Sequence, residues 1–177
     1  YYAFLSGYQS AFLAPTEVLA FQHYKTAIAY LEKYGVKVAF LSGSLKKSER
    51  AIALERIANG EVDVVVGTHA LFSDDVVFRD LALVITDEQQ RFGVKQRSAL
   101  ENKTKDADVV SMTATPIPRT LALTLYGELD VSTIKTMPKN KATIKTRFIP
   151  KEKEDGMWKY VLDKANAGEQ TYIVCPT

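Results

Sequence analysis

Two adjacent carboxylates, Asp87 and Glu88, follow directly after an aliphatic run at residues 81–85. The run is apolar without strict alternation, which is typical of a strand buried on both faces of a parallel sheet. Ligands bind at the carboxyl ends of the strands in such a sheet, so acids at this point are candidates for metal binding or catalysis. The simpler interpretation is a strand that runs into a solvated acidic turn, and two acids alone do not decide between the two.

Five apolar runs, this one included, end in small or polar residues. The clusters lie at residues 14–17, 42–44, 67–69, 87–90 and 113–116. The carboxyl ends of parallel strands share one edge, so these hydroxyl groups and helix N-termini would form a continuous polar surface. Such a surface suits the phosphates of a nucleotide and of a nucleic-acid backbone. Polar turns arising by chance explain one or two of these clusters, but not five in this order.

The elements that must position these clusters alternate along the chain. Strands are predicted at residues 9–14, 36–42, 62–67, 81–87 and 108–114. Helices are predicted from an N-cap at Thr16 to about Gly35, and at 46–59, 95–103 and 117–127, with the last turns of another helix at 1–6. This alternation indicates an α/β fold with a parallel sheet and right-handed crossovers.

The character of the chain changes after residue 134, beyond a predicted strand at 129–134. Residues 135–145 are basic, lack apolar periodicity and contain Pro138, which favours an interdomain linker. A strand at 144–149, a helix at about 151–167 and a strand at 170–175 are predicted to open a second α/β unit. The predicted domains are therefore 1–136 and 144–177, joined by a linker at 137–143.

Composition excludes several classes of protein. A chain of 177 residues with 46% hydrophobic content can bury a substantial core, and a net charge of +2 confines any nucleic-acid surface to a local patch. The single cysteine, Cys175, rules out a disulfide framework and is expected to be a small buried residue. No apolar run is long enough for a membrane span, so we predict a soluble, cytoplasmic protein.

Four segments resemble motifs Ia, Ib, II and III of the superfamily 2 helicases. They read "APTEVLAFQHY", "GTHALF", "DEQQRFGVKQR" and "TATPIPRTLALTLYGELDVS". The sequences that flank the last two motifs, together with the later segment "IKTRFIP", resemble those of the family members that remodel branched DNA. The resemblance covers nearly the whole chain and implies a RecA-like (P-loop NTPase) parallel sheet flanked by helices, truncated at both ends. It also implies part of the motor of an ATP-dependent DNA helicase that remodels forks and junctions in repair and recombination.

The resemblance assigns ATP and Mg²⁺ as cofactors and gives roles to five residues. Asp87 would hold the Mg²⁺ ion, usually through water, and Glu88 would orient and deprotonate the water that attacks the γ-phosphate. Thr113 and Thr115 would couple the nucleotide state to DNA contacts. Gln90 stands where this family usually has His; a glutamine can keep a hydrogen bond to the neighbouring domain but cannot carry a proton.

The resemblance also assigns contacts to the DNA backbone. Pro15, Thr16, Gly67, Thr68 and His69 would lie along the phosphates of the tracked strand. Arg91, Lys95 and Arg97 would line the loop that links the ATP site to the duplex, and Arg119 would add a cationic contact. His69 taken singly is more simply a hydrogen-bonded loop histidine. The aromatic residues of "FQHY" are more simply explained by helix packing than by base stacking. The charges of "KKSER" (46–50) are most simply explained as a solvated helix face.

One expected element is absent from the sequence. No glycine is followed by lysine, so the chain contains no G-x-x-x-x-G-K-[ST] loop. We therefore expect the P-loop, the wedge domain and the rest of the second motor domain to belong to the same protein outside this chain. The chain alone is expected to be inactive toward ATP, because backbone N–H groups and the P-loop Lys cradle the phosphates.

A hypothesis from another class is a nucleic-acid-binding or interaction module that kept the helicase fold without ATP turnover. Asp87, Glu88 and both threonines of "TAT" are present, which favours a hydrolytic parent protein over a decayed one.

Overall fold

The computed structural model describes residues 1–88, 91–92, 107–114, 130–136 and 144–175. The chain divides into two compact units, Tyr1–Glu128 and Leu129–Thr177. The predicted boundaries at 136 and 144 stay predictions, because the linker between them lies outside the described residues.

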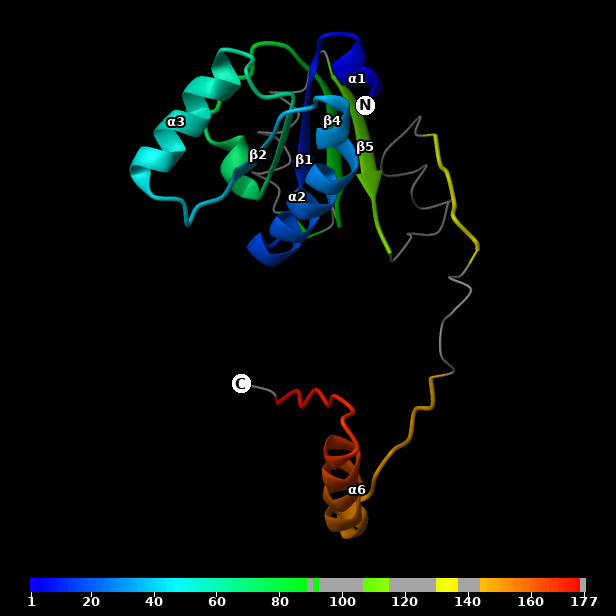
Figure 1. Cartoon of the computed structure of the whole chain (residues 1–177). Helices are drawn as coiled ribbons and strands as arrows, with labels where there is room; N and C mark the ends of the chain where they lie inside the picture. Colours follow the sequence, from blue (N-terminus) through cyan, green and yellow to red (C-terminus); the bar gives the residue numbers. More distant parts are fainter. Residues whose placement is uncertain (89–90, 93–106, 115–129, 137–143, 176–177) are drawn as a thin grey trace. The chain divides into compact units, whose positions relative to one another are not determined.

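A five-stranded sheet forms the centre of the first unit (Figure 1). Its strands are β1 (Gln9–Leu13), β2 (Val38–Leu41), β3 (Val64–Gly67), β4 (Leu81–Asp87) and β5 (Asp108–Met112). They run in the order β2-β3-β1-β4-β5, and every pair is parallel. Each strand lies within its predicted range, so the predicted α/β fold with a parallel sheet is confirmed.

The described helices of the first unit precede the first strand or connect successive strands. They are α1 (Tyr2–Leu5), α2 (Glu17–Leu31) with the 3₁₀ turn η1 (Glu32–Tyr34), α3 (Lys47–Ala58) and the 3₁₀ turn η2 (His69–Phe72). Thr16 is the N-cap of α2, as predicted, because its Oγ1 accepts a hydrogen bond from the Leu19 amide at 3.3 Å. The predicted helices at 95–103 and 117–127 lie outside the described residues.

Helix α2 covers one face of the sheet. The ring of Phe12 on β1 lies 4.5 Å from the ring of His23, measured between centroids. Phe40 on β2 lies 5.6 Å from Phe21 and 5.5 Å from Tyr24. The interpretation of "FQHY" as helix packing therefore holds for Phe21 and Tyr24.

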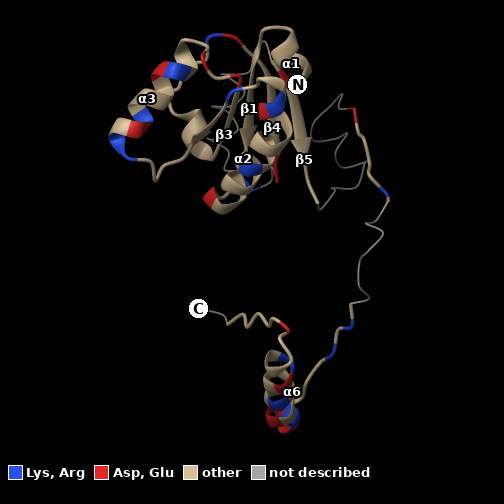
Figure 2. Ribbon diagram, in the orientation of Figure 1, with Lys and Arg blue, Asp and Glu red and all other residues tan. Residues whose placement is uncertain are grey.

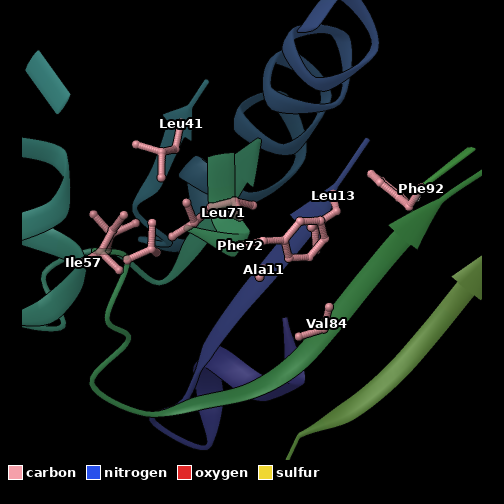
Figure 3. Close-up of a cluster of buried hydrophobic side chains, with 11 residues drawn as sticks. Ala11, Leu13, Leu41, Ile57, Leu71, Phe72, Val84 and Phe92 are labelled. Atoms are coloured by element: carbon pink, nitrogen blue, oxygen red, sulfur yellow. The ribbon is translucent and has the colours of Figure 1, made fainter. Parts of the chain in front are cut away.

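The opposite face carries the main apolar core (Figure 3). Successive strand residues point to opposite faces, so Ala11 and Leu13 flank Phe12 but project away from α2. They pack with side chains from β2, β4, α3 and η2. These include Leu41, Ile57, Leu71, Phe72 and Val84.

One polar side chain, Gln9, is buried at the start of β1 with only 2% of its surface exposed. Its Nε2 donates to the carbonyls of Ile57 at 3.0 Å and Val62 at 2.7 Å. Its Oε1 accepts from the amides of Arg79 at 2.8 Å and Asp80 at 3.2 Å. A primary amide has two N–H donors and one carbonyl acceptor, so every polar group of Gln9 is satisfied. The side chain joins the end of α3 to the loops that lead into β3 and β4.

Gly67 allows β2 and β3 to approach closely at their carboxyl ends. A Cβ atom at this position would lie 2.1 Å from the carbonyl oxygen of Leu41, its partner in the ladder. The obstacle is backbone and cannot swing aside, so only glycine fits without a shift of β2.

The prediction that "KKSER" is only a solvated face is wrong for Arg50, although charges of both signs lie along α3 (Figure 2). The Arg50 guanidinium donates to Asp75 at 2.9 Å and to Ser73 at 2.8 Å. The neighbouring Ser73 side chain, followed by the Arg50 guanidinium, lowers the pKa of Asp75. The lowered pKa contributes stability at neutral pH that is lost as acid protonates Asp75. Ser73 in turn donates to the Ala70 carbonyl at 2.6 Å, so these contacts support η2.

The second unit contains the 3₁₀ turn η4 (Lys151–Lys153) and α6 (Glu154–Asn166), which confirm the predicted helix. The predicted strands at 129–134, 144–149 and 170–175 are wrong for their described residues, which form no strand. A strand needs a neighbour for its N–H and C=O groups, and no described segment pairs with them. Cys175, predicted to be buried, is exposed. No helix among the described residues is long and apolar enough to cross a membrane.

We predict that Gln9→Glu destabilises the first unit by about 2–4 kcal/mol at pH 7, because an isosteric carboxylate places oxygen against two carbonyls. Urea unfolding measures this. Burial raises the pKa of such a carboxyl, so the loss should shrink as the pH falls toward about 4, where the unfolded chain also binds the proton. Gln22→Glu on the exposed side of α2 is the control. Equal midpoints for the two variants would contradict the role given to Gln9.

We also predict that Gly67→Ala costs about 3 kcal/mol, because the methyl group forces β2 and β3 apart. Gly43→Ala is the matched control, since a Cβ there meets nothing within 4 Å. Thermal unfolding of both variants should show a lower midpoint only for Gly67→Ala, and a wild-type midpoint there would show that the close approach is not required.

Candidate functional site

The sheet order brings the five predicted polar clusters to one edge. Following that order, the edge carries Ser42–Ser44 after β2, Gly67–His69 after β3, Pro15–Thr16 after β1, Asp87–Glu88 after β4 and Thr113–Ala114 after β5. Five residues assigned to DNA, Pro15, Thr16, Gly67, Thr68 and His69, therefore lie at the ends of β1 and β3, whereas the residues assigned to the nucleotide lie at the ends of β4 and β5. The two groups meet between β1 and β4, which are neighbours in the sheet.

Asp87 ends β4 and contacts His23 of α2. The Asp87 Oδ2 atom lies 2.9 Å from the His23 Nε2 atom. The side chains keep 21% and 29% of their surface exposed, so the contact is partly shielded from water. An ionised carboxylate only accepts hydrogen bonds, so the proton of the pair is on Nε2. Side chains alternate along β4, and Val84 points into the apolar core on the face away from α2. Asp87, three residues later, therefore points to the face that α2 covers.

Glu88 has a left-handed backbone conformation, with φ of 51°. Its amide donates to the Met112 carbonyl at 2.9 Å, and its carbonyl accepts from the Arg91 amide at 2.9 Å. The carboxylate accepts hydrogen bonds from Thr113 Oγ1 at 3.2 Å and, more weakly, from the Ala114 amide at 3.4 Å. The residue assigned as catalytic base is thus held against the first threonine of "TAT".

The chemistry of the Asp87 carboxylate fits a Mg²⁺ ion bound together with ATP. Mg²⁺ is typically held by one or two carboxylates, substrate phosphates and water, so a protein cage is unnecessary. In the part of the chain that the structure describes, no group of three His, Cys, Asp or Glu residues could hold a metal ion. Among the described residues, Asp87 Oδ1 has no hydrogen-bond partner, which leaves this oxygen available to a water ligand.

The residues assigned to DNA differ in exposure. Thr16, His69 and Arg91 are exposed and Pro15 is half-buried. Thr16 accepts the capping hydrogen bond, which leaves its hydroxyl proton for a phosphate. The side chain of Thr68 is buried. The carbonyl oxygen of Gly67 accepts a hydrogen bond from the amide of Ala14 at 3.0 Å.

A second contact at this edge joins α2 to the loop after β2. The Glu17 carboxylate accepts a hydrogen bond from Ser42 at 3.2 Å and another from Ser44. Neither His23 nor Glu17 was singled out from the sequence. The sequence feature that could have indicated His23 is a polar residue amid the aromatic residues of "FQHY". Its contact with Asp87 could not be predicted from this feature, because the contact requires β4 to lie beside β1.

Several predicted site residues lie outside the described residues. They are Gln90, Lys95, Arg97, Thr115 and Arg119. Their assignments stay predictions, as do the roles of the residues placed above.

Comparison with known proteins agrees with the resemblance seen in the motifs. ATP-dependent DNA helicase RecG of Bacillus subtilis strain 168 is 51% identical over 176 residues, which is 99% of this chain and 26% of that protein. RecG of Staphylococcus aureus strain NCTC 8325 is 47% identical over 171 residues, which is 97% of this chain and 25% of that protein. The chain thus spans about a quarter of the length of these relatives.

A solved structure described as RecG bound to a three-way DNA junction matches 97% of this chain and 23% of that chain. Its TM-score is 0.76 at 41% sequence identity. This similarity confirms the RecA-like fold of the five-stranded sheet. Residues 3–124 match the family described as DEAD/DEAH box helicase. The chain belongs to the DEAD/DEAH box helicase family.

Proposed function

We propose that this chain is part of the motor of an ATP-dependent DNA helicase that remodels branched DNA in repair and recombination. The observation that carries the proposal is the pair of acids at the end of β4, of which one contacts α2 and the other contacts Thr113 after β5. The names of the similar proteins, ATP-dependent DNA helicase RecG, and the three-way DNA junction bound by one of them, support it. A cytoplasmic location follows from action on DNA.

In this proposal Glu88 positions and deprotonates the water that attacks the γ-phosphate. The hydrogen bond from Thr113 fixes one carboxylate oxygen, and the amide of Ala114 approaches the other. A base held in place needs little reorganisation in the transition state. Gln90 and Thr115 are assigned to this half of the site from the sequence motifs.

In the same reaction, Asp87 is proposed to help bind the Mg²⁺ ion. When bound with ATP, Mg²⁺ supplies neutralisation of the phosphate charge. The Asp87 carboxylate orients a water ligand of that ion, and it stands beside Glu88 because the two are adjacent in sequence at the strand end. The P-loop that cradles the phosphates is a further part of the protein in this proposal.

The DNA half of the edge binds phosphates rather than bases. Thr16, His69 and Arg91 offer exposed donors, Pro15, Gly67 and Thr68 shape the backbone between them, and Lys95, Arg97 and Arg119 add positive charge. Contacts to phosphate carry no sequence information, so binding should be independent of sequence and weakened by salt.

We predict that Glu88→Gln in the full-length helicase lowers DNA-stimulated ATP turnover by at least about 100-fold, because the amide cannot accept the proton of the attacking water. ATP binding should stay within about threefold, since this role belongs to the transition state. Steady-state kinetics and equilibrium binding of a fluorescent ATP analogue measure the two effects. Glu49→Gln on the exposed surface of α3 is the control. Near-normal turnover of Glu88→Gln would exclude Glu88 as the base.

We also predict that Arg91→Ala weakens DNA binding to the same extent for unrelated sequences. It should reduce the slope of log K against log salt concentration by about 0.9, the value for one phosphate contact. Anisotropy titrations at several salt concentrations provide the slope. Arg56→Ala on α3 is the matched control, because Arg56 is paired with Glu61 rather than assigned to DNA. An unchanged slope for Arg91→Ala would remove Arg91 from the DNA surface.

A further inference from the structure

We propose that His23 is a positioning residue for Asp87, holding the carboxylate in the orientation that the Mg²⁺ side of the ATP site requires. The inference rests on the proposed function, because it concerns the metal-side acid of that site. It adds a residue that lies 64 positions away in sequence, on the helix whose N-terminus is assigned to DNA.

The first argument is that the His23 ring is fixed from two directions. One face packs against the ring of Phe12, with centroids 4.5 Å apart and planes inclined by 36°. The Nε2 atom points to Asp87 Oδ2 at 2.9 Å, which is the distance of a good charge-assisted hydrogen bond. Packing thus determines where the N–H group points, and the N–H group determines where the carboxylate lies.

The second argument concerns the two oxygens of Asp87. A carboxylate at the end of a strand otherwise rotates freely about its terminal torsion, which is broad. With Oδ2 bound to His23, rotation is restricted and Oδ1 is the oxygen left to face a ligand. Groups that orient a metal-side carboxylate in this way typically contribute 10- to 100-fold to metal affinity.

The third argument is that, among the described residues, Asp87 is the hydrogen-bond partner of the His23 ring and the other neighbours are aromatic. Its neighbours on the same face of α2 and β2, Phe21, Tyr24 and Phe40, are aromatic and contact one another. A phenylalanine at position 23 would preserve the contact with Phe12, so packing alone does not require an imidazole. The Asp87 contact is the feature that uses the nitrogen.

The test uses three variants in the full-length helicase. His23→Phe keeps the ring and removes the donor. His23→Gln places an amide N–H near the position of Nε2 and should restore the hydrogen bond. His23→Asn is shorter and polar, and it loses the contact without introducing a larger group. Thermal unfolding reports whether each variant is folded.

The main measurement is the affinity for Mn²⁺ in the presence of ADP, followed by the electron paramagnetic resonance signal of the free ion. We expect His23→Phe and His23→Asn to weaken Mn²⁺ binding by about 10- to 100-fold, and His23→Gln to stay within about threefold of wild type. The Mg²⁺ concentration that half-saturates DNA-stimulated ATP turnover should rise in parallel. DNA affinity without nucleotide should not change.

A double-mutant cycle separates this inference from the proposed function. If His23 acts through Asp87, His23→Phe should have no further effect on Mn²⁺ affinity in an Asp87→Ala background. Wild-type Mn²⁺ affinity in folded His23→Phe and His23→Asn, or equal losses in His23→Gln and His23→Phe, would overturn the role of His23 and leave Asp87 in place. Unchanged Mn²⁺ affinity in Asp87→Ala alone would overturn both assignments.

Discussion

The structure depends on the burial of β1 between β3 and β4. This strand forms parallel ladders on both sides, and its carboxyl end leads into the N-terminus of α2. The amide of Gln9 anchors the other end by four hydrogen bonds, one to the last turn of α3 and three to the loops that precede β3 and β4. Because side chains alternate along β1, one strand presents apolar residues to the core and an aromatic ring to α2. The position of every cluster at the edge follows from this register.

Helix α2 connects the parts of that edge. Glu17 in its first turn contacts Ser42 and Ser44 after β2, and His23 contacts Asp87 after β4. A single helix thus touches the loops of two strands that are separated by β3 and β1 in the sheet. On the other side of Asp87, the hydrogen bond between Glu88 and Thr113 extends the connection to β5. The edge is a chain of polar contacts carried by rigid elements, which suits a site that must respond to two ligands.

Much of the first unit could be predicted from the sequence, because local patterns specify it. Apolar runs bounded by polar clusters gave the five strands, and the hydroxyl of Thr16 marked the start of α2. The contact of His23 with Asp87 could not be predicted, since it depends on the order of strands and on the face from which each side chain emerges. Arg50 was misjudged for the same reason, because its partners lie 23 and 25 residues away. In the second unit, the apolar runs near Ile144 and Ile173 predict strands that the described residues do not form, because strand formation requires a pairing partner that the sequence does not show.

The left-handed backbone of Glu88 places its proposed role in conflict with stability. A non-glycine residue in the left-handed region costs on the order of 1 kcal/mol or more, and here the ladder contact to Met112 and the turn to Arg91 hold it there. Glycine would relieve that cost, so the most stable residue at this position is one without a carboxylate. Selection for heat resistance alone would therefore tend to remove the acid, and its presence agrees with the catalytic role proposed for Glu88.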